Sequence, residues 1–348
     1  MEISKKVFDQ KDNQPITLYT LKNDRGFQMS CIDYGCIITE VVTPDRDGKL
    51  ENVVLGFDTL KEYESDANFF GAMIGRFSGR IKEGSFTLDG ENYQLDRNSN
   101  GHNLHGGPGG FHSVLWDSKV IESDDEAIVE FTYVSRDGEE GFPGNLTMTV
   151  RYTLKNDSNQ LVISYSGKSD KTTLLNVTNH SYFNLSGNLK RTILDHELTM
   201  KSEYYLELDG ELLPTGKLAP VAEDPLFDFR NGRSIREATT AEHPQTKLAG
   251  NGYDHPFIID ETNQPAIELS DSESGRKLLI QTTEPAVVLY TGNAMGGSYS
   301  IRGTEAQNYL GLCLETQSPP DSMNHPHFPS AVLNADEEFK SETIYTFT

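Results

Sequence analysis

Residues 146–154 have the sequence Leu146-Thr147-Met148-Thr149-Val150-Arg151-Tyr152-Thr153-Leu154, in which apolar and polar residues alternate without a fault. Side chains of a β-strand point alternately to its two faces, so this pattern predicts a strand with one buried and one exposed face. The flanking stretches 128–134 and 161–165 also predict strands, although their alternation is less strict. Extended structure therefore dominates the middle of the chain.

Turn chemistry connects further strands. Residues 86–95 contain Asp89-Gly90 between two alternating runs, and this dipeptide tolerates the positive φ angles of a two-residue hairpin turn. A second hairpin is expected over residues 266–281, with its turn near Ser274-Gly275. Helical periodicity is scarce, and the one short helix that it predicts spans residues 234–240. The fold class predicted is all-β: a large antiparallel β-sandwich with few short helices.

The chain has 348 residues, and no low-complexity linker, charge block or internal repeat divides it. Residues 210–250 are the loosest stretch, rich in proline, glycine and charge, and are expected to be an excursion from the main body. We therefore predict a single domain over residues 1–348, since large β-sandwiches often exceed the usual domain length.

Composition limits the location and the partners. No apolar run approaches the roughly 20 residues of a membrane span, and the start lacks the apolar stretch of a secretory signal, so a cytoplasmic location is expected. The three cysteines, at positions 31, 36 and 313, form no metal-type pair and are expected to be reduced and buried.

Acidic residues outnumber basic ones by 53 to 30, which gives a formal charge of −23. The electrostatic field of this negative charge disfavours nucleic acid and anionic membrane surfaces as partners. A strongly phosphorylated substrate would need a cationic cluster, and none stands out. A small neutral ligand is compatible with the charge.

Polar segments that the alternation does not explain contain the candidate chemistry. Histidines occur at 105, beside a glycine run, and at 180, among strand-like residues; Glu315 ends an apolar run. Each has an ordinary structural alternative: a loop histidine, a buried histidine and a strand-end carboxylate held by nearby amide groups. The glycine run is no phosphate loop, because no Lys-Ser or Lys-Thr pair follows it. Neither His102 with His105 nor the pair at 325 and 327 has a convincing third ligand, so no metal is expected.

Together these segments resemble one family, the aldose 1-epimerases, also called galactose mutarotases. The likeness covers essentially the whole chain in the expected order. The segments that carry it are Gly56–Asp58, Gly75–Ile81, Leu104–Gly107, Thr178–Leu185, Leu213–Gly216, Phe227–Arg230, Tyr253–His255 and Leu314–Gln317. The segments centred on the histidine and the glutamate are the specific ones.

The resemblance implies a β-sandwich enzyme that interconverts the α and β anomers of free aldoses. Glu315 matches the family's catalytic base, His180 its general acid, and His105 a second histidine directed at the sugar. The positions that would bind the sugar's hydroxyl groups and line its site are Arg80, Asp254, Tyr182 and Tyr290. The implied partner is a small sugar, the implied pathway is galactose or other hexose metabolism, no cofactor is needed, and the protein would be a monomer or a homodimer.

Three positions depart from the family pattern: Gly79 where many members have asparagine, Pro256 where asparagine is frequent, and Pro319 where phenylalanine is common. They leave open whether galactose, glucose, xylose or maltose is preferred. Three other functions also stay open at this point: a glycosidase that uses Asp254 and Glu315, a sugar-binding module without activity, and a relative that acts on hexose 6-phosphates.

Overall fold

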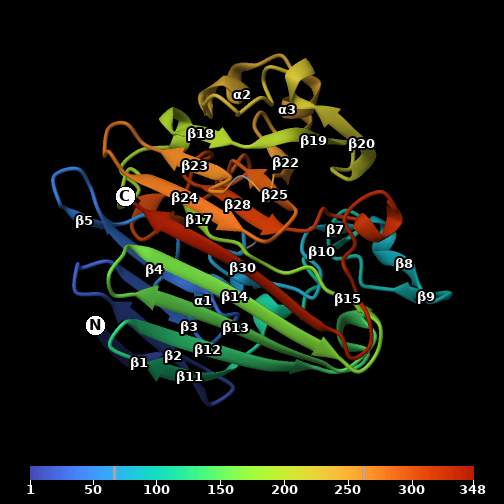
Figure 1. The fold of residues 1–348 in the computed structure, drawn as a ribbon, viewed down its shortest axis with the longest axis horizontal. Helices are drawn as coiled ribbons and strands as arrows, with labels where there is room; N and C mark the ends of the chain where they lie inside the picture. The colour runs from blue at the N-terminus through green and yellow to red at the C-terminus, as the bar shows by residue number, and fades with distance from the viewer. Residues whose placement is uncertain (66–67, 261, 263) are drawn as a thin grey trace.

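A nine-stranded antiparallel sheet forms one layer of the protein in the computed structural model, which describes residues 1–65, 68–260, 262 and 264–348. Figure 1 shows this sheet running from β11 at its lower edge towards β18 at its upper edge. In spatial order its strands are β11 (Asp117–Glu122), β12 (Glu126–Ser135), β13 (Leu146–Lys155), β14 (Gln160–Ser169), β30 (Glu338–Phe347), β24 (Lys277–Thr282), β23 (Ile267–Ser270), β18 (Glu197–Met200) and β21 (Arg233–Ser234).

The second layer consists of a six-stranded and a five-stranded antiparallel sheet. The six-stranded sheet contains β17 (Tyr182–Phe183), β28 (Leu312–Gln317), β25 (Ala286–Tyr290), β22 (Asp254–Ile259), β19 (Ser202–Leu208) and β20 (Pro214–Pro220). The five-stranded sheet contains β1 (Glu2–Lys11), β2 (Gln14–Lys22), β3 (Gln28–Ile32), β4 (Ile38–Pro44) and β5 (Leu50–Asn52). A bridge between Val54, just after β5, and Phe183 of β17 connects the two sheets.

Short strand pairs and helices complete the described part of the chain. The pairs are β6 (Met73–Ile74) with β16 (Thr178–Asn179), β7 (Arg80–Ile81) with β10 (Asn103–Leu104), β8 (Ser85–Leu88) with β9 (Glu91–Gln94), β15 (Thr173–Leu174) with β29 (Val332–Leu333), and β26 (Ser300–Ile301) with β27 (Thr304–Glu305). The α-helices among the described residues are α1 (Leu60–Ser65), α2 (Arg236–Thr240) and α3 (Pro244–Leu248). None of these helices is long and apolar enough to cross a bilayer.

The main core lies between the two layers. On β13 the apolar members of the alternating pattern, from Leu146 to Leu154, are fully buried there. Leu312 and Leu314 of β28 face them from the other layer. Burial of each such side chain contributes about 1.5–3 kcal/mol. Packing in this core fixes the two layers relative to each other and so positions the side chains on their outer faces.

The predicted all-β sandwich is confirmed, and so are the three strands of the central stretch. The 86–95 hairpin pairs β8 with β9, and both turn residues, Asp89 and Gly90, have positive φ. The second hairpin pairs β23 with β24. The predicted helix begins two residues late, at Arg236, because residues 233–234 pair as β21. The stretch 210–250 holds β20, α2 and α3, so it is more regular than expected.

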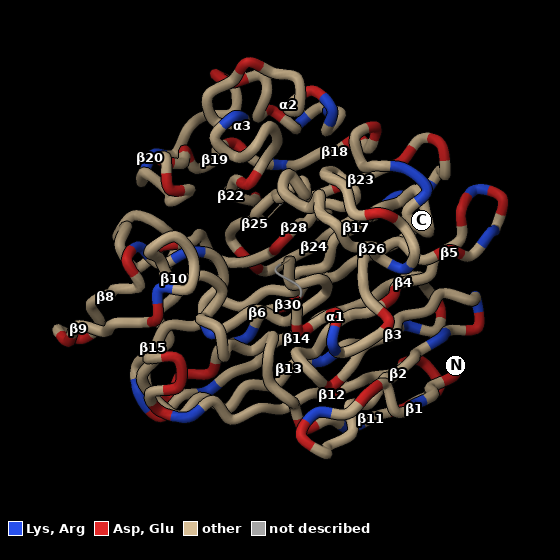
Figure 2. Tube along the Cα trace, turned by 180° about the vertical axis from the view of Figure 1, so that it is seen from behind, with Lys and Arg blue, Asp and Glu red and all other residues tan. Residues whose placement is uncertain are grey.

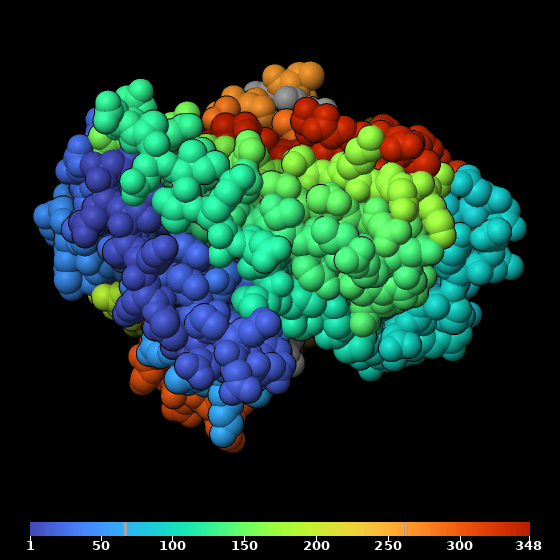
Figure 3. Space-filling model, turned by 90° about the horizontal axis from the view of Figure 1, so that it is seen from below, coloured from blue at the N-terminus to red at the C-terminus, as the bar shows by residue number. Residues whose placement is uncertain are grey.

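The cysteines also agree with the sequence analysis. All three cysteines are free and buried. Acidic residues, red in Figure 2, are distributed around the whole molecule. Seen from below in Figure 3, the N-terminal strands lie beside the strands of the nine-stranded sheet, where the hydroxyl groups of Tyr19 and Ser118 are 2.8 Å apart.

Candidate functional site

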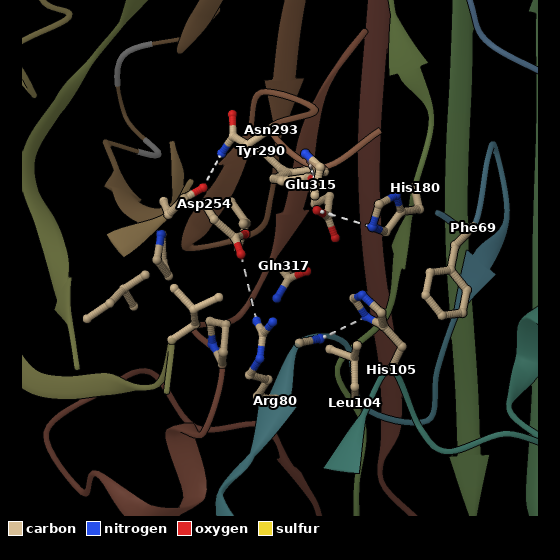
Figure 4. A pocket seen from close by; sticks show the side chains of 18 of the residues that line it. Phe69, Arg80, Leu104, His105, His180, Asp254, Tyr290, Asn293, Glu315 and Gln317 are labelled. Carbon is tan, nitrogen blue, oxygen red and sulfur yellow. Dashed lines mark hydrogen bonds and ion pairs between the residues drawn. The ribbon is translucent and has the colours of Figure 1, made fainter. Parts of the chain in front are cut away.

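A pocket of about 280 Å³ lies against the outer face of the six-stranded sheet, over strands β22, β25 and β28 (Figure 4). All seven site residues expected from the sequence line it: Arg80, His105, His180, Tyr182, Asp254, Tyr290 and Glu315. They come from segments that are far apart in the sequence. The structure therefore brings the whole predicted set to one place.

The period of a β-strand explains how one strand serves both the core and the pocket. Leu312 and Leu314 of β28 point into the core, so the alternating residues Cys313, Glu315 and Gln317 point the other way. On the neighbouring strands, Tyr290 of β25 is opposite Cys313, and Asp254 of β22 is opposite Tyr290. Pairing of the three strands thus lines up their polar residues on the outer face.

Glu315 and His180 are in contact at the base of this pocket. The Nε2 atom of His180 lies 3.5 Å from Oε1 of Glu315, and each residue is only 4% exposed. The backbone of His180 is fixed on both sides, since its N–H donates to the carbonyl of Ala72 and its carbonyl accepts from Gly71. The two titratable groups are therefore held at short range and away from bulk water.

Burial shifts the two groups in opposite directions. It raises the pKa of Glu315 well above its usual value, and the nearby charge of Asp254 adds to this effect. It lowers the pKa of His180 to about 4. A pair with one proton is neutral overall, whether the proton sits on the carboxylate or on the imidazole, whereas adding or removing a proton leaves a buried charge. Burial therefore stabilises the singly protonated pair.

His105 is held in one tautomer. Its Nδ1 accepts a hydrogen bond of 3.2 Å from the backbone N–H of Gly79, so the hydrogen of the neutral ring is on Nε2. Its backbone has a φ of 55°, and the positive φ of Gly106 follows it. The ring stands perpendicular to that of His180, with centroids 5.2 Å apart. His105 thus offers a fixed N–H donor to the same region of the pocket.

The structure brings together a possible set of metal ligands that the sequence analysis did not find. No third ligand was found for His105 there, but the structure places donor atoms of His105, His180 and Glu315 within 4.8 Å of one another. Two histidines and a glutamate are a familiar zinc set. However, a neutral His105 that accepts from Gly79 has no lone pair left on Nε2 for an ion. The hydrogen-bond pattern suits sugar oxygens better than a metal.

Arg80 and Asp254 form a second polar pair in the pocket. Their closest atoms, Nη1 and Oδ2, are 3.8 Å apart, and both side chains are about a fifth exposed, at 19% and 21%. Burial raises the pKa of Asp254, and the charge of Arg80 acts against that shift. A cation and an anion side by side offer both donors and acceptors to neutral hydroxyl groups.

The two tyrosines differ in what they offer. Tyr182 is 1% exposed, and its ring packs beside that of His180 with centroids 5.2 Å apart, so it mainly supports the histidine. Tyr290 is partly exposed to the pocket, and its hydroxyl accepts a hydrogen bond from the N–H of Ala294. Tyr290 is therefore the tyrosine that presents an aromatic surface to a ligand.

Two further pocket residues were not identified from the sequence. Phe69 packs against both histidines, with ring centroids 4.9 Å from His105 and 5.9 Å from His180. Gln317 is fully buried, and its Oε1 accepts from the hydroxyl of Ser78 at 2.7 Å. The spacing of two residues from Glu315 on the same strand could have pointed to Gln317. Phe69 lies outside the strands, where no periodicity indicates its direction.

Known proteins match this chain over nearly its whole length. The model of the family described as aldose 1-epimerase matches residues 17–346. Galactose mutarotase of Sus scrofa is 39% identical over 95% of this chain and 93% of the pig protein. Aldose 1-epimerase of Escherichia coli is 36% identical over 97% of this chain and 96% of its own length. The crystal structure of galactose 1-epimerase from Lactobacillus acidophilus superposes with a TM-score of 0.88 at 32% identity, covering 100% of this chain and 98% of that one.

Proposed function

The chain belongs to the aldose 1-epimerase family, and we propose that Glu315 and His180 perform its reaction, the interconversion of α and β anomers of free aldohexoses such as galactose and glucose. The enzyme is an isomerase that acts on carbohydrates. The observation that carries the assignment of the two residues is their contact of 3.5 Å at the base of a sugar-sized pocket.

The proposed reaction opens and recloses the sugar ring. In the tautomer of the singly protonated pair that has the proton on the imidazole, the Glu315 carboxylate takes the proton of the C1 hydroxyl while Nε2 of His180 gives its proton to the ring oxygen, and the C1–O5 bond breaks. The aldehyde turns about C1–C2. On reclosure His180 takes the proton back from the O5 hydroxyl and Glu315 returns its own to O1. The pair ends each turnover as it began, so no cofactor is required.

The surrounding residues would orient the sugar. The Nε2–H of His105 donates to a sugar oxygen, because Gly79 occupies its other nitrogen. Arg80 and Asp254 hold hydroxyl groups further from the reacting carbon, and Tyr290 offers its face to C–H groups. These contacts are directional, and together they would place C1 and O5 against the acid–base pair.

Polarimetry tests the proposal. Pure α-D-galactose and, separately, α-D-glucose are dissolved with and without the protein, and the optical rotation is followed over time. We expect a faster approach to the same final rotation, and loss of this acceleration in Glu315→Gln and His180→Asn. A sugar-binding module would bind without acceleration, and a glycosidase would release reducing sugar from an aryl galactoside. Acceleration only with hexose 6-phosphates would contradict the free-sugar assignment.

A single domain and a cytoplasmic location remain part of the proposal. One core cluster contains residues from Tyr19 to Phe347, which supports one domain over the whole chain. Three buried free thiols are compatible with a reducing compartment. The expected oligomeric state, a monomer or a homodimer, stays a prediction that light scattering would test.

A further inference from the structure

Cys313 lies on the pocket side of β28, two residues before Glu315. Its side chain is fully buried, opposite Tyr182 on one neighbouring strand and Tyr290 on the other. Its Sγ is 3.5 Å from Nδ1 of His180. The strand that carries the glutamate therefore also contacts the histidine, on the nitrogen that does not face Glu315.

The chemistry of an imidazole makes this second contact significant. Nε2 of His180 faces Glu315, so it is the nitrogen that can exchange a proton with the sugar. When Nε2 gives up its proton, the ring becomes neutral only if Nδ1 keeps a hydrogen; otherwise an imidazolate anion would form. A hydrogen that stays on Nδ1 needs an acceptor, and the sulfur of Cys313 is at that position.

The sulfur is suited to be a neutral acceptor. Burial raises the pKa of the Cys313 thiol well above its usual value, and the charge of Glu315 adds to this, so the thiol keeps its own proton. A thiol sulfur is a weak acceptor. It can hold the hydrogen on Nδ1 without the negative charge that would make His180 a much poorer acid.

We propose that Cys313 is a positioning residue that keeps a hydrogen on Nδ1 of His180 and thereby makes Nε2 the atom that exchanges a proton with the ring oxygen. This inference rests on the proposed function and deepens it. In the opening step the Nε2–H bond breaks and an O5–H bond forms; reclosure reverses both. The Nδ1–H bond and the thiol are unchanged throughout.

Two substitutions separate this role from simple packing. Cys313→Ala removes the acceptor, and we expect kcat for galactose to fall about fivefold to tenfold with KM unchanged. Cys313→Ser supplies a hydroxyl acceptor, and we expect it to recover most of the lost kcat. If the thiol only filled space, a buried hydroxyl would be no better than alanine, so equal or lower kcat for the serine variant overturns the proposal.

Cys31→Ala is the matched control. Cys31 is equally buried, but it lies on β3 in the main core, whereas Cys313 contacts His180. We expect this variant to keep the wild-type kcat even if its stability falls. A loss of kcat as large as that of Cys313→Ala would attribute the effect to lost packing and contradict the proposal.

Nitrogen NMR of histidine-labelled protein without sugar tests the inference apart from activity. We expect His180, assigned by comparison with His180→Asn, to carry its hydrogen on Nδ1 in the wild type and in Cys313→Ser, and to lose this preference in Cys313→Ala. A wild-type ring with its hydrogen on Nε2 and a bare Nδ1 overturns the inference even in an active enzyme. Failure of the wild type in polarimetry would instead contradict the proposed function.

Discussion

At the scale of single residues, the neutral acid–base pair is the feature from which activity is best predicted. Glu315→Gln keeps the size of the side chain but removes the basic oxygen. We expect kcat to fall by about 10²–10⁴-fold, with sugar affinity changed little, as measured by polarimetry and calorimetry. Glu268→Gln, a change on the surface of β23, is the control and should have no effect. An active Glu315→Gln enzyme would sink the mechanism.

The pH dependence of kcat/KM, which reports the free enzyme, follows from the same pair. The active form of the Glu315–His180 pair holds one proton. Activity is lost when His180 binds a proton as well, so that the pair holds two, or when the pair loses its last proton. Because the pKa of His180 is lowered to about 4 and that of Glu315 is raised, both limits move outwards. We expect a broad plateau with its acid limb near pH 4 for the free enzyme, measured as kcat/KM against pH. An acid limb at the ordinary histidine value of about 6.5 would contradict this.

Phe69 is the residue whose removal should narrow that plateau. Its ring covers His105 and His180, and its φ of 58° is unusual for a residue with a side chain. Phe69→Ala would admit water, weaken the effect of burial and raise the pKa of His180, so the acid limb should move towards higher pH. Phe69→Leu keeps an apolar cover and is the control. If both variants kept the wild-type profile, Phe69 would have no part in setting it.

At the scale of elements, the turn that precedes the short strand β7 packs tightly against Pro320. A Cβ atom on Gly79 would lie 2.8 Å from both Cβ and Cγ of Pro320, and Gly79 has a φ of +80°. The backbone N–H of Gly79 also fixes His105. The glycine at position 79 is therefore required by the shape of this wall of the pocket.

We predict that Gly79→Asn costs about 1–3 kcal/mol of unfolding free energy and lowers activity, and that Pro320→Gly in the same chain, which removes both contacting atoms, restores part of both. Urea denaturation and polarimetry measure the two effects. Gly90→Asn is the matched control, because Gly90 has the same φ of +80° but nothing within 4 Å of an added Cβ. If the Gly79 and Gly90 variants lost equal stability, the backbone and not the contact with Pro320 would be the cause.

The elements also indicate how far the sequence alone could lead. Alternation in residues 146–154 predicted β13, and Asp89-Gly90 predicted the β8–β9 turn, because both signals are local. The helix α1 was missed although Thr59 and Glu62 form a capping box that is visible in the sequence. The helix α3 has a histidine ring, His243, as its N-cap acceptor, which no usual capping pattern indicates.

The candidate site, too, could be predicted from the sequence only in part. Family resemblance placed all seven residues at the pocket, whereas their distances depend on how β22, β25 and β28 pair. The contact of Cys313 with His180 and the cover of Phe69 arise from segments that are far apart in the chain. Such contacts are properties of the packed molecule and leave no local pattern.

At the scale of the whole molecule, a buried ion pair ties the two layers together. Arg276, just before β24, and Glu51 of β5 are 3.1 Å apart, and each side chain is 1% exposed. Burial alone would raise the pKa of Glu51, but hydrogen bonds from lysines 190 and 49 and from Arg276 outweigh it and lower the pKa to about 2. The stabilisation is therefore present above the unfolded value of 4.5 and is lost as pH falls from there towards 2.

We predict that Arg276→Met destabilises the protein by about 3–5 kcal/mol at pH 7, since it leaves the carboxylate of Glu51 buried with less compensation. Urea denaturation measures the loss. Adding Glu51→Leu should recover part of it, because no buried charge then remains, and the single variant should differ less from the wild type near pH 2. A loss below about 1 kcal/mol at pH 7 would contradict this account of the interface.

The alternation of β28 has a consequence for how this enzyme can change over generations. Its even-numbered positions serve the core and its odd-numbered positions serve the chemistry, so substitutions at either set can be selected almost independently. An insertion or deletion of one residue within Leu312–Gln317 would exchange the two sets, and would bury the glutamate in the core while turning leucines into the pocket. In natural and directed evolution alike, this strand can therefore accept single substitutions, whereas insertions and deletions within it are excluded.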